Sequence, residues 1–250
     1  IFEYPFNDHT EELGKSDLEI HIASDEKWNL LVFIDGNYSP TLSSYPNNLD
    51  NIQIENLRSA LQKGGSPIEN HLGRHANFKT DGFTAINTAF LNNGAFVCVP
   101  NDTAISTPVH LLFVSTQREI PTASHPRSLI TVGQNSNLTI LESYLGLTNH
   151  VYFTNSVTEI VAEAGASVEH YRYVMESPNA FHIGTTRVKL GQDSILNSIS
   201  IAKGAKLARN DTQVLLNGPG ASCALSGLYV TSGKQHIDNH INIDHAMPHT

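Results

Sequence analysis

The sequence has 250 residues, a length within the range of a single all-β domain. Hydrophobic residues make up 40% and charged residues 16%, with 17 glycines and 11 prolines, which fits a turn-rich β protein better than a helical bundle. Acidic residues outnumber basic ones by 24 to 15 without a basic stripe, which argues against a nucleic-acid ligand. No apolar run approaches the roughly 20 residues that cross a bilayer, so we expect a soluble intracellular protein with no membrane partner.

The first 82 residues differ from the rest and predict a small mixed segment of strands and helix. Trp28 to Ile34 reads as a strand that enters an Asp35-Gly36 turn and then a second strand. Residues 50–63 read as a strand that leads into a short helix, and Gly64 to Pro67 then break the chain. Residues 66–82 are rich in His, Asn and Gly with little periodicity, which indicates a connector.

From about residue 83 onward the sequence repeats itself. A turn of Gly, Asn or Asp precedes a small residue and then an alternating strand. Four of these small residues are spaced by 30, 28 and 27 positions: Ser136, Ala166, Ser194 and Ala221. Asn92 to Ala95, ahead of Phe96 to Val99, reads as an earlier and weaker copy. A second strand is expected in each interval, at 152–160, 185–190, 212–216 and 237–244.

This period predicts a solenoid. A unit of roughly 25 to 30 residues with two short strands cannot bury its apolar face alone and must stack on its neighbours. The expected fold is all-β, with a parallel β-helix over residues 83–250 after the mixed segment 1–82. A sandwich or jelly roll also has short strands at regular spacing and is the alternative.

The two cysteines, Cys98 and Cys223, stand in apolar, strand-like sequence 125 positions apart. This is the pattern of structural thiols in a reducing compartment. We therefore expect both side chains to be reduced, buried and slow to react.

The end of the chain carries the densest set of polar side chains. His236, Asp238, His240 and Asp244 alternate with residues that include three isoleucines, so in a strand they share one face. His236, Asp238 and His240 are candidate metal ligands if a neighbouring coil adds another, whereas a solvated outer ladder is the simpler interpretation. A cupin fits poorly, because cupins use a His-x-His pair and the spacings here are His-x-x-x-His and His-x-Asp.

Signals of enzymatic catalysis are weak. The sequence contains neither a Gly-x-Ser-x-Gly elbow nor a Walker-type phosphate loop. The nearest enzyme hypothesis is a β-helical polysaccharide lyase or hydrolase, but the arginines it would use, Arg127, Arg172, Arg187 and Arg209, are far apart in sequence. We therefore expect a protein that binds partners and is not an enzyme.

Several segments, taken in order, resemble the SufB/SufD family, and SufD most closely. They are Leu31–Ser43, Phe83–Phe90 with Asn93-Gly94-Ala95, His125–Ile130 ahead of Leu141–Tyr144, Arg209–Asp211, Leu225–Tyr229, Gln235–His240 and Asp244–His249. The resemblance covers roughly residues 28–250.

The resemblance implies a right-handed parallel β-helix that acts as a non-enzymatic scaffold in iron–sulfur cluster assembly. It implies a SufB-like paralogue and a SufC-like ATPase as partners, in the cytoplasm or, in a plant, in the plastid stroma. No intrinsic cofactor is expected, because two cysteines cannot supply the four thiolates of a cluster. Any iron–sulfur cluster would be transient and shared with a partner.

The family continues beyond the segment that ends at Thr250 into further strands and a C-terminal helical domain, so we expect this chain to be a core fragment. The end of the solenoid is then expected at a partner junction, because unpaired strand edges associate unless they are capped. The interface candidates are His236, Asp238, His240, Asp244 and His245. In isolation the same edge is expected to self-associate, for example as a homodimer.

Overall fold

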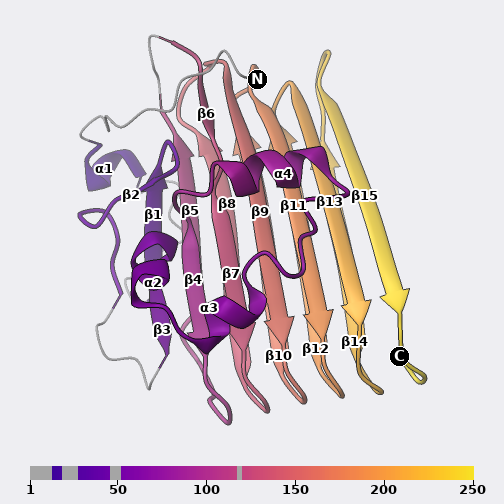
Figure 1. The fold of residues 1–250 in the computed structure, drawn as a ribbon. Helices are drawn as coiled ribbons and strands as arrows, with labels where there is room; N and C mark the ends of the chain where they lie inside the picture. The colour runs from indigo at the N-terminus through magenta and orange to yellow at the C-terminus, as the bar shows by residue number, and fades with distance from the viewer. Residues whose placement is uncertain (1–12, 19–27, 46–51, 117–119) are drawn as a thin grey trace.

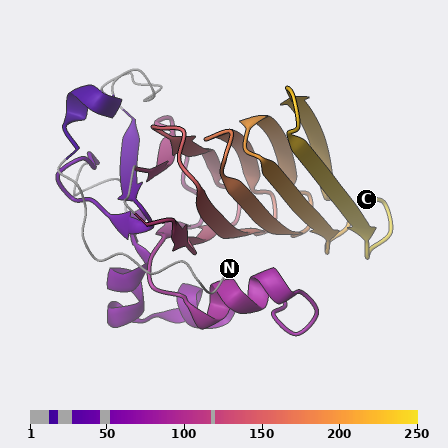
Figure 2. The same ribbon diagram turned by 90° about the horizontal axis from the view of Figure 1, so that it is seen from above.

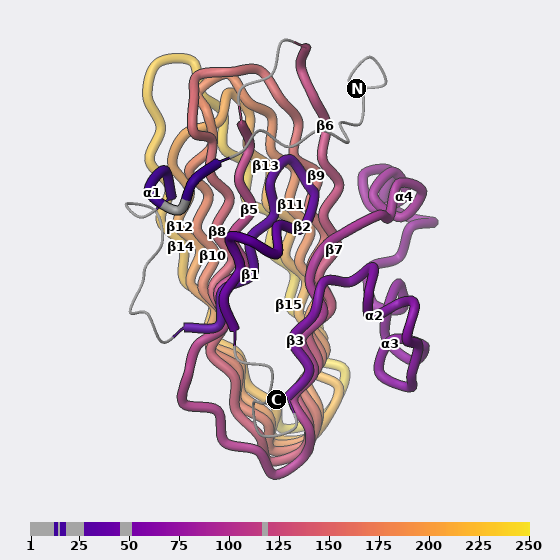
Figure 3. The backbone as a smooth tube through the Cα atoms, turned by 90° about the vertical axis from the view of Figure 1, so that its left-hand side faces the viewer, coloured from indigo at the N-terminus to yellow at the C-terminus, as the bar shows by residue number. Residues whose placement is uncertain are grey.

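The structure is a computed structural model that describes residues 13–18, 28–45, 52–116 and 120–250. The chain winds into a flattened coil whose two long walls are β-sheets, here called sheet A and sheet B (Figure 1, Figure 3). From β8 onward the strands alternate between the two sheets, so each coil contributes one strand to each wall. The predicted β-solenoid is confirmed.

Strand pairing runs in one continuous order along each sheet. Sheet A has the order β14 (Ser222–Val230), β12 (Ile195–Gly204), β10 (Ser167–Glu176), β8 (Asn137–Gly146), β5 (Val109–Ser115), β1 (Asn29–Ile34) and β2 (Asn37–Tyr38). Sheet B has the order β15 (His236–His245), β13 (Leu207–Leu216), β11 (Phe181–Leu190), β9 (Tyr152–Ala162), β7 (Arg127–Val132), β4 (Ala95–Val99) and β3 (Gln53–Asn56), with β6 (Thr122–Ser124) beside β9. The pairs β1–β2 and β3–β4 are antiparallel and the other strand pairs are parallel, which excludes the sandwich and jelly-roll alternative.

The corner before each long strand of sheet A repeats in three dimensions. The four small residues of the repeat are buried and stand immediately before β8, β10, β12 and β14: Ser136, Ala166, Ser194 and Ala221. The residue before each has a positive φ, and these residues are Asn135, Gly165, Asp193 and Gly220. Gly, Asn and Asp adopt this left-handed conformation at the lowest cost, which explains the residue types at the turn. The prediction of equivalent corners is confirmed.

The first copy of this corner lies elsewhere than predicted. Asn92 to Ala95 lead into β4 of sheet B, whereas the repeated corners lead into sheet A. The corner that precedes the one at Asn135 is instead at Asp102. Asp102 has a φ of 54° and donates its backbone N–H to the carbonyl of Gln134 at 2.7 Å. The prediction was wrong because a Gly-Ala pair before a strand marks a bend into either sheet.

The N-terminal segment covers part of the outer face of each sheet, over the first coils. Leu18 of helix α1 (Lys15–Leu18) and Leu42 pack on the apolar outer face of sheet A. Helices α2 (Leu57–Lys63), α3 (Ser66–His71) and α4 (Gly82–Ala89) lie along the outer side of sheet B (Figure 2). The apolar surface that the first coils would otherwise expose is thereby removed from water.

Local predictions for this segment agree with the structure within the described residues. The strand, Asp35-Gly36 turn and second strand become β1 and β2, and the strand-to-helix step becomes β3 and α2. Helix α4 occupies residues 82–89, and β1 pairs in parallel with β5, so sheet A begins before residue 83. The division into domains at residues 82 and 83 stays a prediction.

The cysteines differ partly from expectation. Both are free, as predicted, but both are half-buried and not buried. Cys98 lies on the outer side of β4, where it packs on the cluster formed with helices α2 and α3. Cys223 lies on the interior side of β14, where no described strand covers it, and its partial burial still raises the pKa of its thiol.

Two buried histidines make the fold sensitive to acid. Burial lowers the pKa of His110 and of His125 from 6.5 to about 4. Between pH 6.5 and 4 these two histidines bind protons in the unfolded chain but not in the folded chain. The free energy of unfolding therefore keeps its full value above pH 6.5 and decreases as the pH falls. We expect urea denaturation to show a loss of about 2 kcal/mol per histidine between pH 7 and pH 5. His110→Gln should reduce this pH dependence, and substitution of the exposed His249 by Gln is the control.

Candidate functional site

The last coil leaves an open edge on each sheet. β14 ends sheet A and β15 ends sheet B, and within the described residues each pairs with one strand only (Figure 1). An unpaired strand edge presents backbone N–H and C=O groups that can pair with another strand. The candidate interface residues therefore stand on the last described strand, which can pair with a further strand of this chain or of a partner.

Side chains of the last coil that face the interior are exposed. Tyr229 is 61% exposed, Ile241 57% and Ile243 41%. Tyr229 and Ile241, together with Ser198 and Asn210 of the preceding coil, line an open cavity of about 250 Å³ at this end of the solenoid. These apolar side chains are the ones that a following coil, or a partner, would bury.

The alternation predicted for the last strand is observed. The residues on the outer face of β15 are His236, Asp238, His240, Asn242 and Asp244. His245 lies on the other side, because it pairs in register with the buried core residue Leu216. The predicted interface candidates are thus divided between the two faces of β15.

Ion pairs connect this outer face to the preceding strands. Arg187 Nη1 lies 2.7 Å from Asp211 Oδ1, and Asp211 Oδ2 lies 3.2 Å from His240 Nδ1. Arg209 forms an ion pair with Asp238. The half-exposed pair of Arg209 and Asp238 contributes little stability, whereas the pair of Arg187 and Asp211 is largely shielded from water.

The geometry does not bring His236, Asp238 and His240 together around one metal ion, and their place at an interface stays a prediction. Within the described residues, no group of three or more His, Cys, Asp or Glu side chains is placed to hold a metal ion. His236 and His240 stand four positions apart on one strand, about 13 Å at the usual rise, too far for two bonds of about 2 Å to the same ion. Asp238 between them is paired with Arg209.

The four arginines of the polysaccharide hypothesis do not converge. Arg127 is buried on the outer side of sheet B, beneath helix α4, and Arg172 is buried inside the solenoid. Arg187 is paired with Asp211 on the outer face of sheet B, and Arg209 with Asp238. The single basic groove that such an enzyme uses is therefore not formed by these residues.

A buried polar network that the sequence analysis missed fills the middle of the solenoid. Arg172 of β10 reaches across the interior and donates to Thr186 Oγ1 and Ser156 Oγ, each at 3.2 Å. The Glu142 carboxylate is fully buried and accepts from Thr158 Oγ1 at 2.8 Å. Burial alone would raise the pKa of Glu142, but His170 and Arg172 outweigh it and hold the pKa below its usual range.

The same network also fixes the tautomer of the buried residue His182. Arg172 Nη2 donates to His182 Nε2 at 2.8 Å, so His182 Nδ1 carries the proton and donates to Glu176 Oε1 at 2.9 Å. Tyr152 donates its hydroxyl proton to the same Glu176 carboxylate. Burial is the main cause that lowers the pKa of His182. Both ring nitrogens of His182 are thereby paired, whereas Arg172 Nε has no hydrogen-bond partner among the described residues.

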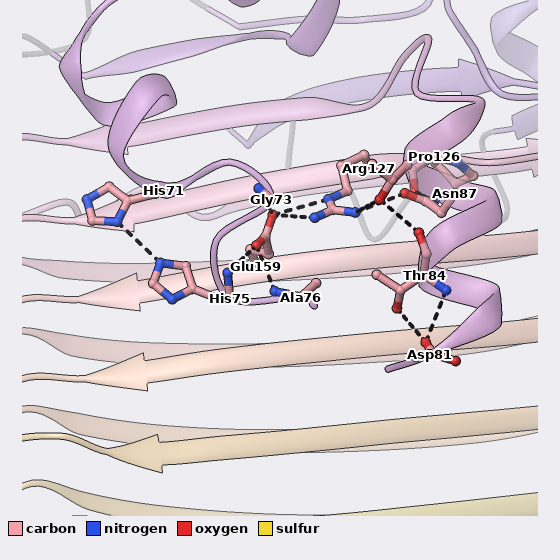
Figure 4. Close-up of polar contacts among 11 residues, drawn as sticks. His71, Gly73, His75, Ala76, Asp81, Thr84, Asn87, Pro126, Arg127 and Glu159 are labelled. Atoms are coloured by element: carbon pink, nitrogen blue, oxygen red, sulfur yellow. Dashed lines mark hydrogen bonds and ion pairs between the residues drawn. The ribbon is translucent and has the colours of Figure 1, made fainter. Parts of the chain in front are cut away.

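A second missed feature holds the connector against sheet B (Figure 4). The buried carboxylate of Glu159 accepts backbone N–H groups of Gly73, His75 and Ala76 at 2.8 to 2.9 Å. Arg127 donates to the same carboxylate through Nε at 3.1 Å and Nη2 at 2.7 Å. Together these contacts form the Glu159 clamp, which fixes a loop without regular structure on a rigid strand.

Arg127 extends the Glu159 clamp to the last connector helix. Its Nη1 atom donates to Asn87 Oδ1 at 3.2 Å, and Asn87 Nδ2 donates to the carbonyl of Pro126 at 3.0 Å (Figure 4). Helix α4 begins at its cap Asp81, whose carboxylate accepts the backbone N–H of Thr84 at 3.0 Å. One sequence feature could have indicated the Glu159 clamp. It is the presence of a charged residue inside an otherwise apolar strand, as at Glu159 within Val157 to Ala162.

Comparison with known proteins shows the family of this chain. A family model described as "SUF system FeS cluster assembly, SufBD core domain" matches residues 113–250, and one described as "SufBD protein N-terminal region" matches residues 26–111. The chain belongs to the SufB/SufD family of iron–sulfur cluster assembly proteins. The resemblance to this family stated from the sequence motifs is confirmed.

Relatives of both branches of the family are similar to this chain. An iron–sulfur cluster assembly SufBD family protein of Synechocystis is 32% identical over 88% of the chain and 50% of its own length. SufB of Bacillus subtilis is 24% identical over 80% of the chain and 43% of its own length. SufD of Escherichia coli is 21% identical over 86% of the chain and 48% of its own length. The closer relation to SufD stays a prediction.

The chain spans about half the length of the relatives that it matches. Among the described residues, no helix is both long enough and apolar enough to cross a membrane.

Proposed function

We propose that this chain is the solenoid part of a non-enzymatic scaffold subunit in a SufBCD-type iron–sulfur cluster assembly complex. A SufB-like paralogue binds at the last coil, and a SufC-like ATPase supplies nucleotide turnover. The complex works in the cytoplasm or, in a plant, in the plastid stroma. The observations that carry this proposal are the β-solenoid fold and the match to the SufBD core and N-terminal family models over residues 113–250 and 26–111.

Three properties of the last coil support a partner at this position. Its unpaired strands offer main-chain hydrogen bonds, as in proteins that extend a sheet across an interface. Its exposed Tyr229, Ile241 and Ile243 offer apolar surface for burial. Its outer charges, at His236, Asp238, His240 and Asp244, form a row that a complementary partner edge can match.

No resident cofactor is part of this proposal. Cys98 and Cys223 lie on different sheets and face opposite sides of the solenoid wall, so they do not form a thiolate pair. An iron–sulfur cluster handled by the complex would take further ligands from a partner chain, because four thiolates are usual. The cluster is therefore cargo shared with a partner.

A charge placed on the last strand tests the proposed interface. Ile243→Lys should weaken association with a SufB-like paralogue at least tenfold, because an inward-pointing lysine at a strand edge blocks pairing. Ile199→Lys is the matched control, since Ile199 and Ile243 are both 41% exposed but Ile199 lies on the outer face of β12. The measurement is co-purification with the paralogue and a SufC-like ATPase, followed by sizing with light scattering.

The same experiment distinguishes self-association from partner binding. The chain alone should form a concentration-dependent homodimer that Ile243→Lys also weakens. Unchanged partner binding by Ile243→Lys, or equal loss with Ile199→Lys, would show that the last coil is not the interface.

A further inference from the structure

Two histidines of the connector lie side by side on the outer face of sheet B. His71 is the last residue of helix α3, and His75 follows it in the turn that the Glu159 clamp holds. His71 Nδ1 lies 3.3 Å from His75 Nε2, and the two rings are stacked with an interplanar angle of 21° (Figure 4). Both side chains are half-buried, so a solvent ion can reach them.

The separation of the two nitrogens fits a shared metal ion. Zinc–imidazole bonds of about 2.0–2.1 Å at a tetrahedral angle place two nitrogens about 3.3 Å apart. The distance from His71 Nδ1 to His75 Nε2 is also 3.3 Å. Because the two nitrogens already face each other, small rotations of the two rings direct both lone pairs at one ion.

The backbone around these histidines is fixed by hydrogen bonds before a metal ion binds. The N–H groups of Gly73, His75 and Ala76 are all bound by the Glu159 carboxylate, which the guanidinium of Arg127 holds in turn. A site whose supporting contacts are fixed loses less entropy when the ion binds. The Glu159 clamp therefore positions His75 beside His71 before any ion arrives.

Burial and nearby charges act on both imidazoles. Burial is the largest cause that lowers the pKa of His71 and of His75, and Lys189 acts in the same direction. The carboxylates of Glu159 and Glu163 oppose this effect without reversing it. Neutral imidazole is the form that binds metals, and the distance between the two ring nitrogens is the observation on which the site rests.

We propose that His71 and His75 form a two-histidine site for a divalent transition-metal ion, of the kind that zinc and copper exemplify. The imidazole that now donates its N–H to the other takes the opposite neutral tautomer when the ion binds, so its proton moves to the second ring nitrogen. Within the described residues no third His, Cys, Asp or Glu joins the pair. The other coordination positions are filled by water or by an exogenous ligand.

The surroundings leave room for such a ligand. His75 also lines an open cavity of about 390 Å³ between the connector and strands β11, β13 and β15 of sheet B, with Arg74 and Lys189 among its walls. A site with open coordination positions beside a cavity differs from a closed structural zinc site, which has four protein ligands. The proposed site is therefore suited to reversible binding.

Calorimetric titration of the intact chain with zinc chloride tests this site. We expect one zinc ion per chain, and more than tenfold weaker binding by His71→Gln and by His75→Gln, since loss of a ligand exceeds the roughly tenfold effect of disturbing a supporting group. The control is His236→Gln/His240→Gln, which removes two histidines with the same sequence spacing from β15 and should bind zinc normally. Absence of stoichiometric binding, or loss only in the β15 control, overturns the proposal.

A measurement on the unaltered chain removes any dependence on how the variants fold. Substoichiometric copper(II) broadens the magnetic resonance signals of nearby histidine ring protons. The signals of His71 and His75 should broaden first. Earlier broadening of His236 or His240, or uniform broadening of all histidines, overturns the proposal.

Discussion

Glu159→Ala should lower the free energy of unfolding by about 3–5 kcal/mol, the range found when one partner of a buried ion pair is removed. The side chains of Glu159 and Arg127 are 0% and 2% exposed. The substitution leaves the Arg127 guanidinium without its carboxylate in a site that water does not reach. It also leaves three backbone N–H groups of the connector, at Gly73, His75 and Ala76, without their acceptor.

Urea denaturation at neutral pH measures this effect, with Glu163→Ala as the control. Glu163 is an exposed glutamate one residue beyond β9, so its removal should change stability by less than about 0.5 kcal/mol. A loss below about 1 kcal/mol for Glu159→Ala would mean that the Glu159 clamp does not hold the connector.

The pH dependence provides a second check on the same carboxylate. Burial alone would raise the pKa of Glu159, but Arg127 and the backbone N–H groups of Ala76 and Gly73 outweigh it and lower the pKa. The contribution to stability is therefore present above the pKa of glutamate in the unfolded chain and is lost as the pH falls through the lower pKa of the folded chain. The Glu159→Ala variant should lack this part of the acid-induced loss.

Gly94→Ala should destabilise the protein by about 2–6 kcal/mol, the sum of a strained backbone and an overpacked contact at about 1–3 kcal/mol each. Gly94 has a φ of 151°, which a residue with a side chain rarely adopts. A Cβ atom there would lie 1.8 Å from the carbonyl oxygen of Arg127 and 2.7 Å from its backbone nitrogen. Because these are backbone atoms of β7, strand β4 would have to move away from its neighbour.

Gly82→Ala is the matched control for this substitution. Gly82 is the first residue of helix α4, and a Cβ atom there would meet no atom within 4 Å. Alanine favours helix over glycine by about 1 kcal/mol, so this variant should be as stable as the parent or slightly more stable. Thermal unfolding compares the two variants, and equal midpoints would show that β4 tolerates a side chain at Gly94.

Much of the solenoid was predictable because its determinants are local and repeated. The positive-φ corner before each strand of sheet A admits only Gly, Asn and Asp at low cost, so Asn135, Gly165, Asp193 and Gly220 leave a visible period. Alternation in the last strand correctly placed His236, Asp238 and His240 on one face, because a strand has a period of two.

Other features depend on contacts that a single sequence does not reveal. Glu159 accepts hydrogen bonds from Gly73 and His75, which are more than 80 positions away in the sequence. Arg172 and Glu176 are linked through His182, to which each is hydrogen-bonded. A charged residue in a strand predicts an outward side chain by default, so the inward-facing Glu142 and Arg172 were missed. The earlier corner at Asp102 was missed because its Pro100-Asn101-Asp102 turn differs from the later copies.

Hydrogen–deuterium exchange of the chain, alone and bound to a SufB-like paralogue, is the measurement that tests the proposed scaffold function most directly. Backbone N–H groups at an unpaired edge exchange quickly and become protected when another strand pairs with them. We predict that binding slows exchange in β14 and β15 and leaves helices α2 to α4 unchanged. Protection that appears over the connector helices while β14 and β15 stay unchanged would contradict the account.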